Sequence, residues 1–130
     1  QSAIGRQLFA LDLTPESFRR ELAGCRTFIP QEVAQGMLSQ GIGQRVTARD
    51  LLIFGPHGPI DNKLRFSDEC VRHKLLDVVG DLALTGCEVV GHIAAYRSGH
   101  HLHAELAKRL TEQAEARDER FDLLPQRHCA

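Results

Sequence analysis

The sequence lacks both a large charge of one sign and a long apolar run, and each absence excludes a class of function. The 130 residues carry a formal net charge of −1, so the composition does not indicate a nucleic-acid partner or a membrane surface. No apolar run reaches the roughly 18 residues that a transmembrane helix needs, and no secretory signal is recognisable. We therefore expect a cytoplasmic protein with no transmembrane segment.

The four cysteines lack the paired spacing of a zinc-binding or redox motif. Cys25, Cys70, Cys87 and Cys129 are widely separated along the chain, which predicts separate thiols in a reducing compartment. Hydrophobic residues make up 42% of the chain and charged residues 25%, values typical of a globular domain with a core of its own. The chain begins with Gln rather than Met, which suits a domain excised from a longer protein.

Segment 71–81 carries the pattern with the most chemical content. His73, Asp77 and Asp81 recur every four residues, so on a helix each advances only about 40° from the last and the three form one polar stripe. Apolar residues form a separate stripe that can pack on a core: Val71, Leu75, Val78 and Val79 of this segment, and Leu82 just after it. An imidazole and a carboxylate one turn apart can bind one zinc ion, although a catalytic zinc usually has three protein ligands. A solvated helix face has the same spacing, so the spacing alone leaves both interpretations open.

Local patterns predict both strands and helices. Strands are expected where apolar residues alternate or form a short run, at 3–13, 51–54, 88–96 and, as a last edge strand, 121–124. Helices are expected where apolar residues recur at helical spacing, at 14–24, 30–40, 67–86 and from 98 onward. Gly24 is expected to end the first helix in a left-handed conformation, and Ser98 to cap the last one. This order predicts an α+β fold, a two-layer sandwich in which a small mixed or antiparallel sheet packs against two main helices.

Segments 64–81 and 95–100 combine into a longer pattern. The first contains Leu64-Arg65-Phe66, Asp68-Glu69 and the run from Val71 to Asp81, and the second reads Ala95-Tyr96-Arg97-Ser98-Gly99-His100. Together with shorter matches at 13–18 and 26–28, this pattern resembles the zinc-dependent UDP-3-O-acyl-N-acetylglucosamine deacetylase of lipid A synthesis. The resemblance extends to about residue 110 and covers only the C-terminal half of that two-domain family.

The resemblance implies a role for the polar stripe. His73 and Asp77 would bind Zn²⁺, and a third histidine ligand and a glutamate general base would come from the N-terminal domain of the same enzyme. His100, oriented by Asp81, would be the general acid that protonates the departing glucosamine nitrogen. That proton transfer is chemically reasonable, because a nearby carboxylate favours the protonated imidazole.

The resemblance also implies how a UDP-linked acylated amino sugar would be bound. Lys74 would contact the substrate's phosphate or the developing charge, and Arg97 stands where the family usually has lysine. We expect one domain over residues 1–130, with an insert-like subdomain at 29–63 and a tail at 117–130. In the family this insert helps to line a passage for the acyl chain, and the candidate wall residues are Val33, Met37, Leu38, Leu52 and Phe54. These residues fit the domain's own core equally well.

Two other interpretations remain open. One is a self-contained metallohydrolase that uses His57, His92 or the histidines within 100–103 as further ligands. The other is a non-catalytic binding module that keeps only the fold. On the deacetylase interpretation, His92 is a structural histidine on a strand, and His101 and His103 are surface residues. Because the sequence offers no identifiable third ligand or general base, we expect this chain alone to bind zinc weakly and not to deacetylate.

Overall fold

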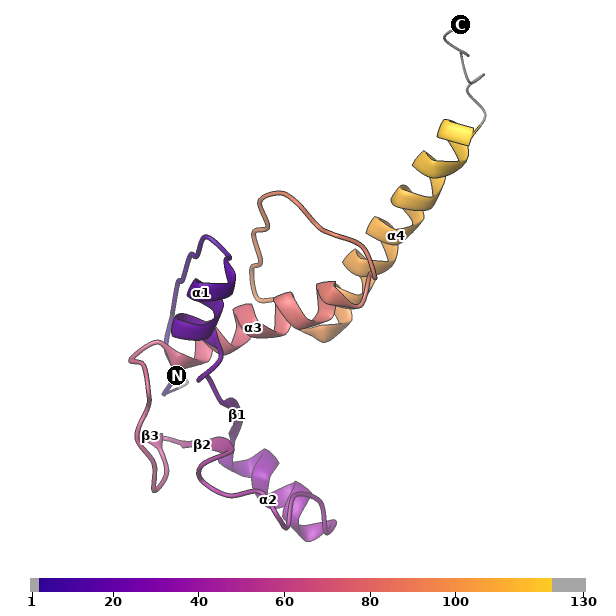
Figure 1. The fold of residues 1–130 in the computed structure, drawn as a ribbon. Helices are drawn as coiled ribbons and strands as arrows, with labels where there is room; N and C mark the ends of the chain where they lie inside the picture. The colour runs from indigo at the N-terminus through magenta and orange to yellow at the C-terminus, as the bar shows by residue number, and fades with distance from the viewer. Residues whose placement is uncertain (1–2, 123–130) are drawn as a thin grey trace, which may run out of the picture. The chain divides into compact units, whose positions relative to one another are not determined.

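The computed structural model describes residues 3–122, with side chains described as far as residue 117. The chain falls into two compact units, Gln1–Leu76 and Asp77–Ala130. One helix, α3 (Glu69–Ala83), which is labelled in Figure 1, contributes residues to both units. No helix in the described part of the chain is both long and apolar enough to cross a membrane.

The first unit contains a three-stranded mixed sheet in the order β1-β2-β3. Strands β1 (Thr27–Pro30) and β2 (Leu51–Gly55) are parallel, with Phe28 opposite Leu52. The short β3 (Gly58–Pro59) returns antiparallel to β2. Parallel neighbours need a crossover connection, and α2 (Gln31–Ser39) lies in that crossover and packs on both strands. The helix expected at 30–40 and the strand expected at 51–54 are both confirmed.

The core of the first unit lies between this sheet and the start of α3. Leu52 and Phe54 of β2 are buried together with Cys70 of α3. Three partly buried side chains pack around this cluster: Ile4, Phe28 and Leu64. Helices packed on a small mixed sheet confirm the predicted α+β class. The prediction of one domain over the whole chain stays a prediction.

The helix expected at 14–24 is present but irregular. It begins as α1 (Pro15–Ser17) and continues as a π-helical turn, η1 (Phe18–Leu22). Thr14 and Ser17 form a reciprocal capping box that satisfies the first free N–H groups of the helix. The helix ends near Gly24, as predicted, with Ala23 as its capping residue, but Gly24 does not take the expected left-handed conformation.

The strand predicted at 3–13 was wrong, since residues 5–14 have no regular secondary structure. This segment instead contacts α3 through side chains. Gln7 Oε1 accepts a hydrogen bond of 3.0 Å from the N–H of Val71, and the ring of Phe9 lies 4.1 Å from the Arg72 guanidinium. Alternation of apolar residues predicts a face to be buried, but it does not supply the neighbouring strand that a β-ladder needs.

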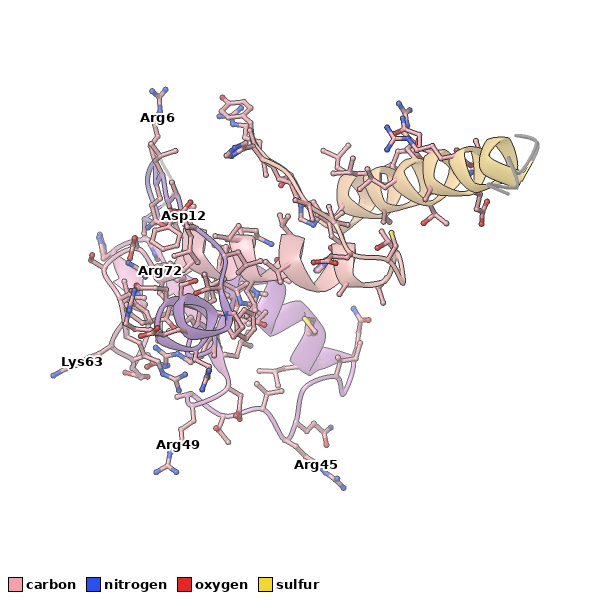
Figure 2. The ribbon with its side chains drawn as sticks, turned by 45° about the horizontal axis from the view of Figure 1, so that its top comes forward. Arg6, Asp12, Arg45, Arg49, Lys63 and Arg72 are labelled. Carbon is pink, nitrogen blue, oxygen red and sulfur yellow. The ribbon has the colours of Figure 1, made fainter. Side chains whose placement is uncertain are left out.

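Arg72 is enclosed from two sides in this packing. Its guanidinium lies between the rings of Phe9 and Phe66, at 4.1 and 4.5 Å from their centres. It also pairs with the carboxylates of Glu21 and Asp68. Figure 2 shows the contrast with other cationic side chains of this unit, which extend away from the ribbon: Arg6, Arg45, Arg49 and Lys63.

The second unit contains the end of α3, a connecting segment and α4 (His100–Asp122). Helix α3 is shorter than the predicted 67–86 and ends at Ala83, three residues before Gly86, whose φ of 69° suits glycine. Val78 and Leu82 of α3 are buried with Ala107 of α4, and Leu110 packs beside them. This small apolar cluster holds the two helices together within the unit.

The strand predicted at 88–96 was also wrong. These residues form an irregular connection between α3 and α4 (Figure 1). The alternation placed Val89, Ile93 and Ala95 on one apolar face, and all three are exposed, Val89 at 38% and Ile93 at 48%, so that face is not covered in this unit. The edge strand predicted at 121–124 was wrong at Phe121 and Asp122, which end α4, and its remaining two residues lie outside the described ones.

Candidate functional site

In the second unit, two histidines of α4 contact one carboxylate oxygen of α3. His100 Nδ1 lies 2.7 Å from Asp81 Oδ2, and His103 Nδ1 lies 2.8 Å from the same atom. Gly99 directly precedes α4, and its carbonyl accepts hydrogen bonds from the N–H groups of Leu102 and His103 in the first turn. The two histidines are three residues apart in the first turn, so they lie on the same side of the helix.

The two histidines differ in their exposure. The side chain of His100 is 70% exposed, whereas His103 is 4% exposed. Burial opposes the charge of the Asp81 carboxylate, but hydrogen bonds from His100 and His103 outweigh burial and lower the pKa of Asp81 below its ordinary value. Asp81 is therefore held as an ionised acceptor for both rings.

His103 corrects a prediction, because it is not a surface residue. Its second ring nitrogen, Nε2, lies 2.8 Å from Ser98 Oγ. The Ser98 hydroxyl, expected to cap α4, contacts this ring. The signal available in the sequence was the three-residue spacing from His100, which places the two side chains on one face of a helix. His101, between them, is exposed as predicted.

His100 also lies near a second carboxylate of α3. Its Nε2 is 4.0 Å from Asp77 Oδ2, while its Nδ1 contacts Asp81. Asp77 and Asp81 are one helical turn apart, and their side chains are 10% and 19% exposed. The structure therefore brings together three of the predicted site residues in this unit.

The other two predicted polar site residues of α3, His73 and Lys74, lie in the first unit beside one aromatic ring. His73 is 9% exposed and meets Phe28 edge to face, with ring centres 6.0 Å apart. The Lys74 ammonium lies 5.5 Å from the centre of the same ring. Sequence reasoning gave Phe28 no role near the site. The contact of this β1 side chain with His73, and its packing against the core cluster that contains Cys70 of α3, was the information that was missing.

The apolar residues predicted to contact substrate differ in whether their side chains are exposed. Val33 and Met37 of α2 are 47% and 38% exposed, whereas Leu52 is fully buried. Leu52 belongs to the core of the first unit, so its side chain presents no surface to a ligand in this structure. Arg97 has a left-handed backbone with φ of 49°, and its guanidinium lies 5.7 Å from the ring centre of Tyr96.

Two sets of residues have the chemistry to bind a metal ion. Among the described residues, one group offers at least three donors whose ligand atoms lie within 4.8 Å of one another, and it consists of Asp81, His100 and His103. The other set is His73 and Asp77, an imidazole and a carboxylate one turn apart on α3. His57 and His92, the further candidate ligands, are exposed.

A histidine oriented by an aspartate, beside residues of metal-binding type on an α+β scaffold, is typical of a metal-dependent hydrolase that uses histidine as its acid. The comparison with known families makes this class specific. The model of the family described as "LpxC: UDP-3-O-acyl N-acetylglycosamine deacetylase" matches residues 1–112, and the chain belongs to this family.

Individual relatives agree with the family assignment. A UDP-3-O-acyl-N-acetylglucosamine deacetylase of Thermosynechococcus vestitus is 43% identical over 111 residues, which are 85% of this chain and 38% of that protein. The proteins of the same name from Brucella ovis and Brucella melitensis are each 43% identical over 109 residues, or 82% of this chain and 38% of theirs. The chain thus spans about 38% of the length of these relatives.

Proposed function

We propose that this chain forms the C-terminal half of a zinc-dependent deacetylase that removes the N-acetyl group of UDP-3-O-acyl-N-acetylglucosamine in lipid A biosynthesis. The family match and the name of the relatives support the reaction, and the 38% coverage of those relatives supports the partial length. The observation that carries the proposal is the position of His100, with one ring nitrogen on Asp81 and the other near Asp77.

The residues of α3 fit a zinc ion by their donor types. His73 and Asp77 provide one imidazole nitrogen and one carboxylate from successive turns of a single helix, and both are ligands that zinc prefers. When bound, the ion would supply a polarised acetyl carbonyl and a water of lowered pKa. We assign His73 and Asp77 as its ligands within this chain.

His100 has the geometry of a proton donor. The ionised Asp81 carboxylate can only accept, so the hydrogen bond between them places a proton on Nδ1 of His100. When the ring is protonated at both nitrogens, Nε2 carries the second proton, and this proton is the one delivered to the departing glucosamine nitrogen. The ring is exposed enough to reach a substrate, and the carboxylate of Asp81 stabilises the imidazolium before transfer.

Two cationic side chains are assigned to the substrate's negative charges. Lys74 follows His73 directly on α3, and both side chains contact the ring of Phe28. Arg97 stands three residues before His100 and keeps the charge expected at that position. Its planar guanidinium can contact phosphate oxygens through two parallel N–H groups, which a lysine cannot do.

We infer that this chain contains half of the active site. A third histidine ligand and a glutamate general base are expected from the N-terminal domain of the same enzyme. Zinc sites with fewer than three protein ligands are weak, and a deacetylase without its base is slow. The isolated chain is therefore expected to bind zinc weakly and to leave the substrate unchanged.

A chimaera tests the proposal directly. In it, this chain replaces the matching 111 residues of the Thermosynechococcus vestitus relative, so that the remaining part of the site is present. The chimaera is expected to deacetylate, and Asp77→Asn and His100→Gln are each expected to lower kcat at least about 100-fold. His101→Gln, an exposed neighbour on α4, is the matched control and is expected to keep activity.

Turnover by the isolated chain at the rate of the chimaera would overturn the proposal that the site is incomplete. An active chimaera that is unaffected by Asp77→Asn and His100→Gln would overturn the assigned roles. A chimaera that folds but has no activity would favour a non-catalytic binding module.

The three-donor group of the second unit supports one alternative function, a self-contained metallohydrolase. Calorimetric titration of zinc into the isolated chain distinguishes a self-contained metallohydrolase from the C-terminal half of a deacetylase. Tight binding of one ion that is lost in His103→Ala and kept in His73→Ala would favour the alternative. Weak binding that depends on His73 and Asp77 is the result expected for the deacetylase half.

A further inference from the structure

We propose that His103 is a positioning residue of this site, which holds the Asp81 carboxylate in place for His100 and is itself held by Ser98. The inference rests on the proposed function for its catalytic meaning. The hydrogen-bonded chain on which it stands lies entirely within the second unit and is a property of this structure.

The first argument is that His103 has no nitrogen left for a substrate. Its Nδ1 contacts Asp81 Oδ2 at 2.8 Å and its Nε2 contacts Ser98 Oγ at 2.8 Å. The ring is 4% exposed, and a buried polar ring requires such partners. His103 therefore acts on the reaction only through Asp81, whereas His100 keeps an exposed ring and an Nε2 that faces Asp77.

The second argument concerns the direction of each hydrogen bond. An ionised carboxylate accepts and never donates, so both histidines donate from Nδ1 to Asp81 Oδ2. In the neutral ring, Nε2 of His103 then has a lone pair, and the Ser98 hydroxyl donates to it. Ser98 thereby selects the tautomer of His103, and His103 in turn fixes the acceptor oxygen that His100 uses.

The third argument is mechanical. Without His103, a partly exposed aspartate near the end of a helix can change its χ1 rotamer, and His100 would lose its partner. With His103 in place, one carboxylate oxygen is bound from two directions, and the two rings meet edge to face with centres 6.2 Å apart. Fixing the orientation of an acid in this way contributes to catalysis through preorganisation rather than through substrate binding.

Isosteric variants of His103 separate positioning from simple packing. The amide of asparagine coincides roughly with Nδ1 of histidine, so His103→Asn keeps a donor for Asp81. The longer glutamine side chain places its amide near Nε2, so His103→Gln keeps a partner for Ser98 and loses the donor to Asp81. His103→Leu keeps volume and removes both contacts. His101→Asn, at the exposed position beside it, is the control.

The primary measurement uses the chain itself and requires no activity. Nitrogen-15 chemical shifts of the His100 ring, recorded at a pH where the ring is neutral, report which nitrogen carries the proton. The wild-type chain and His103→Asn are expected to show a proton fixed on Nδ1. His103→Leu and His103→Gln are expected to show exchange between the two tautomers. Circular dichroism confirms that each variant is folded.

The second measurement uses the chimaera described above. His103→Leu is expected to lower kcat by about 10- to 100-fold, the usual effect of removing an outer partner, and to leave KM within about twofold because no substrate contact is lost. His103→Asn is expected to recover most of kcat, and Ser98→Ala to cause a smaller loss than His103→Leu.

Two outcomes would overturn the inference. One is a His100 spectrum in His103→Leu that matches the wild type, and the other is an equal loss of kcat in His103→Asn and His103→Leu, which would indicate packing alone. A folded chimaera without activity would count against the proposed function, while the spectra would still decide whether His103 fixes the tautomer of His100.

Discussion

Arg26 and Glu69 form a buried ion pair in the first unit, with Arg26 Nε 2.9 Å from Glu69 Oε1 and the two side chains 7% and 0% exposed. The carboxylate also accepts hydrogen bonds from the N–H groups of Arg26 and Arg65. The guanidinium donates to three further acceptors in the neighbouring loops, at Ala48, Asn62 and Lys63. This pair therefore connects the segment before β1, two loops and the first turn of α3, the helix that carries the proposed metal ligands.

Glu69→Gln is expected to destabilise the chain strongly. The neutral amide keeps the shape of the carboxylate, but one end of it donates and would face N–H groups that also donate. Breaking one partner of a buried pair typically costs about 3–5 kcal/mol, measurable as a change in the free energy of unfolding by urea. The control is Arg45→Gln, an exposed arginine (Figure 2), which is expected to change stability by less than about 0.5 kcal/mol. A loss below about 1 kcal/mol in Glu69→Gln would mean that the pair adds little.

The same carboxylate gives stability a defined pH dependence. Burial raises the pKa of Glu69, but hydrogen bonds from Arg26 and Arg65 outweigh it and leave the pKa below its ordinary value of 4.5. A group with a depressed folded-state pKa stabilises the fold fully above its unfolded-state pKa, and this contribution is lost as the pH falls toward the folded-state value. The free energy of unfolding is therefore expected to decrease as the pH falls below about 4.5, and to decrease less steeply in Glu69→Gln. Parallel curves for the two proteins between pH 7 and pH 3 would contradict this.

Arg72→Lys is expected to destabilise the chain although it keeps the charge. The guanidinium of Arg72 stacks between Phe9 and Phe66, and a lysine ammonium has no flat face to fill that space. We expect a loss of about 1–2 kcal/mol, the scale of a desolvated cation–π contact, measured by urea unfolding. Arg6→Lys, at an exposed position (Figure 2), is the matched control. If both changes had the same small effect, the stacking would be energetically unimportant.

The parts of the fold that sequence patterns predicted are those whose signals are local. The helix at α2, the strand at β2 and the helix α3 each follow from apolar spacing and from nearby glycines. The segments at 3–13 and 88–96 alternate in the same way as strands, yet neither forms one. A strand exists only if another strand pairs with it, and the periodicity of a segment carries no information about its partner.

In the candidate site too, local spacing was predictable from the sequence and contacts between distant segments were not. The four-residue spacing of Asp77 and Asp81 placed both on one helix face, and the structure brings His100 to both of them. The burial of His103 was not predictable from its own segment, because it depends on Asp81, 22 positions earlier in the chain. The same holds for Phe28 beside His73. Contacts between distant segments, rather than spacing within one, decided which polar residues became part of the site.

The cysteines are expected to react very differently with an alkylating agent. Burial raises the pKa of the Cys25 and Cys70 thiols to about 11, and both are buried, whereas Cys87 is exposed. At pH 8, iodoacetamide is expected to modify Cys87 within minutes and to leave Cys25 and Cys70 unmodified until urea unfolds the chain, because the thiolate is the reactive form. Mass spectrometry of the tryptic peptides measures each site. Rapid modification of Cys70 in the native protein would show that the cluster of Leu52, Phe54 and Cys70 opens readily.

Substitutions of Leu52, Val33 and Met37 are expected to show which of these predicted substrate contacts stabilise the core and which lie on the surface. Leu52 is fully buried in the core, at 0% exposure, so Leu52→Ala should lower the free energy of unfolding by about 2–5 kcal/mol. Val33→Ser and Met37→Gln alter side chains that are 47% and 38% exposed, and should change stability by less than about 0.5 kcal/mol.

If Val33 and Met37 line the acyl-chain passage and bind the acyl chain equally in the ground and transition states, these same two variants should raise KM of the chimaera for acylated substrate and leave kcat close to that of the parent. A substrate analogue without the acyl chain provides the control, because its KM should not respond. An unchanged KM for the acylated substrate would assign the exposed apolar face of α2 to another role, and the passage would have to be formed by other residues.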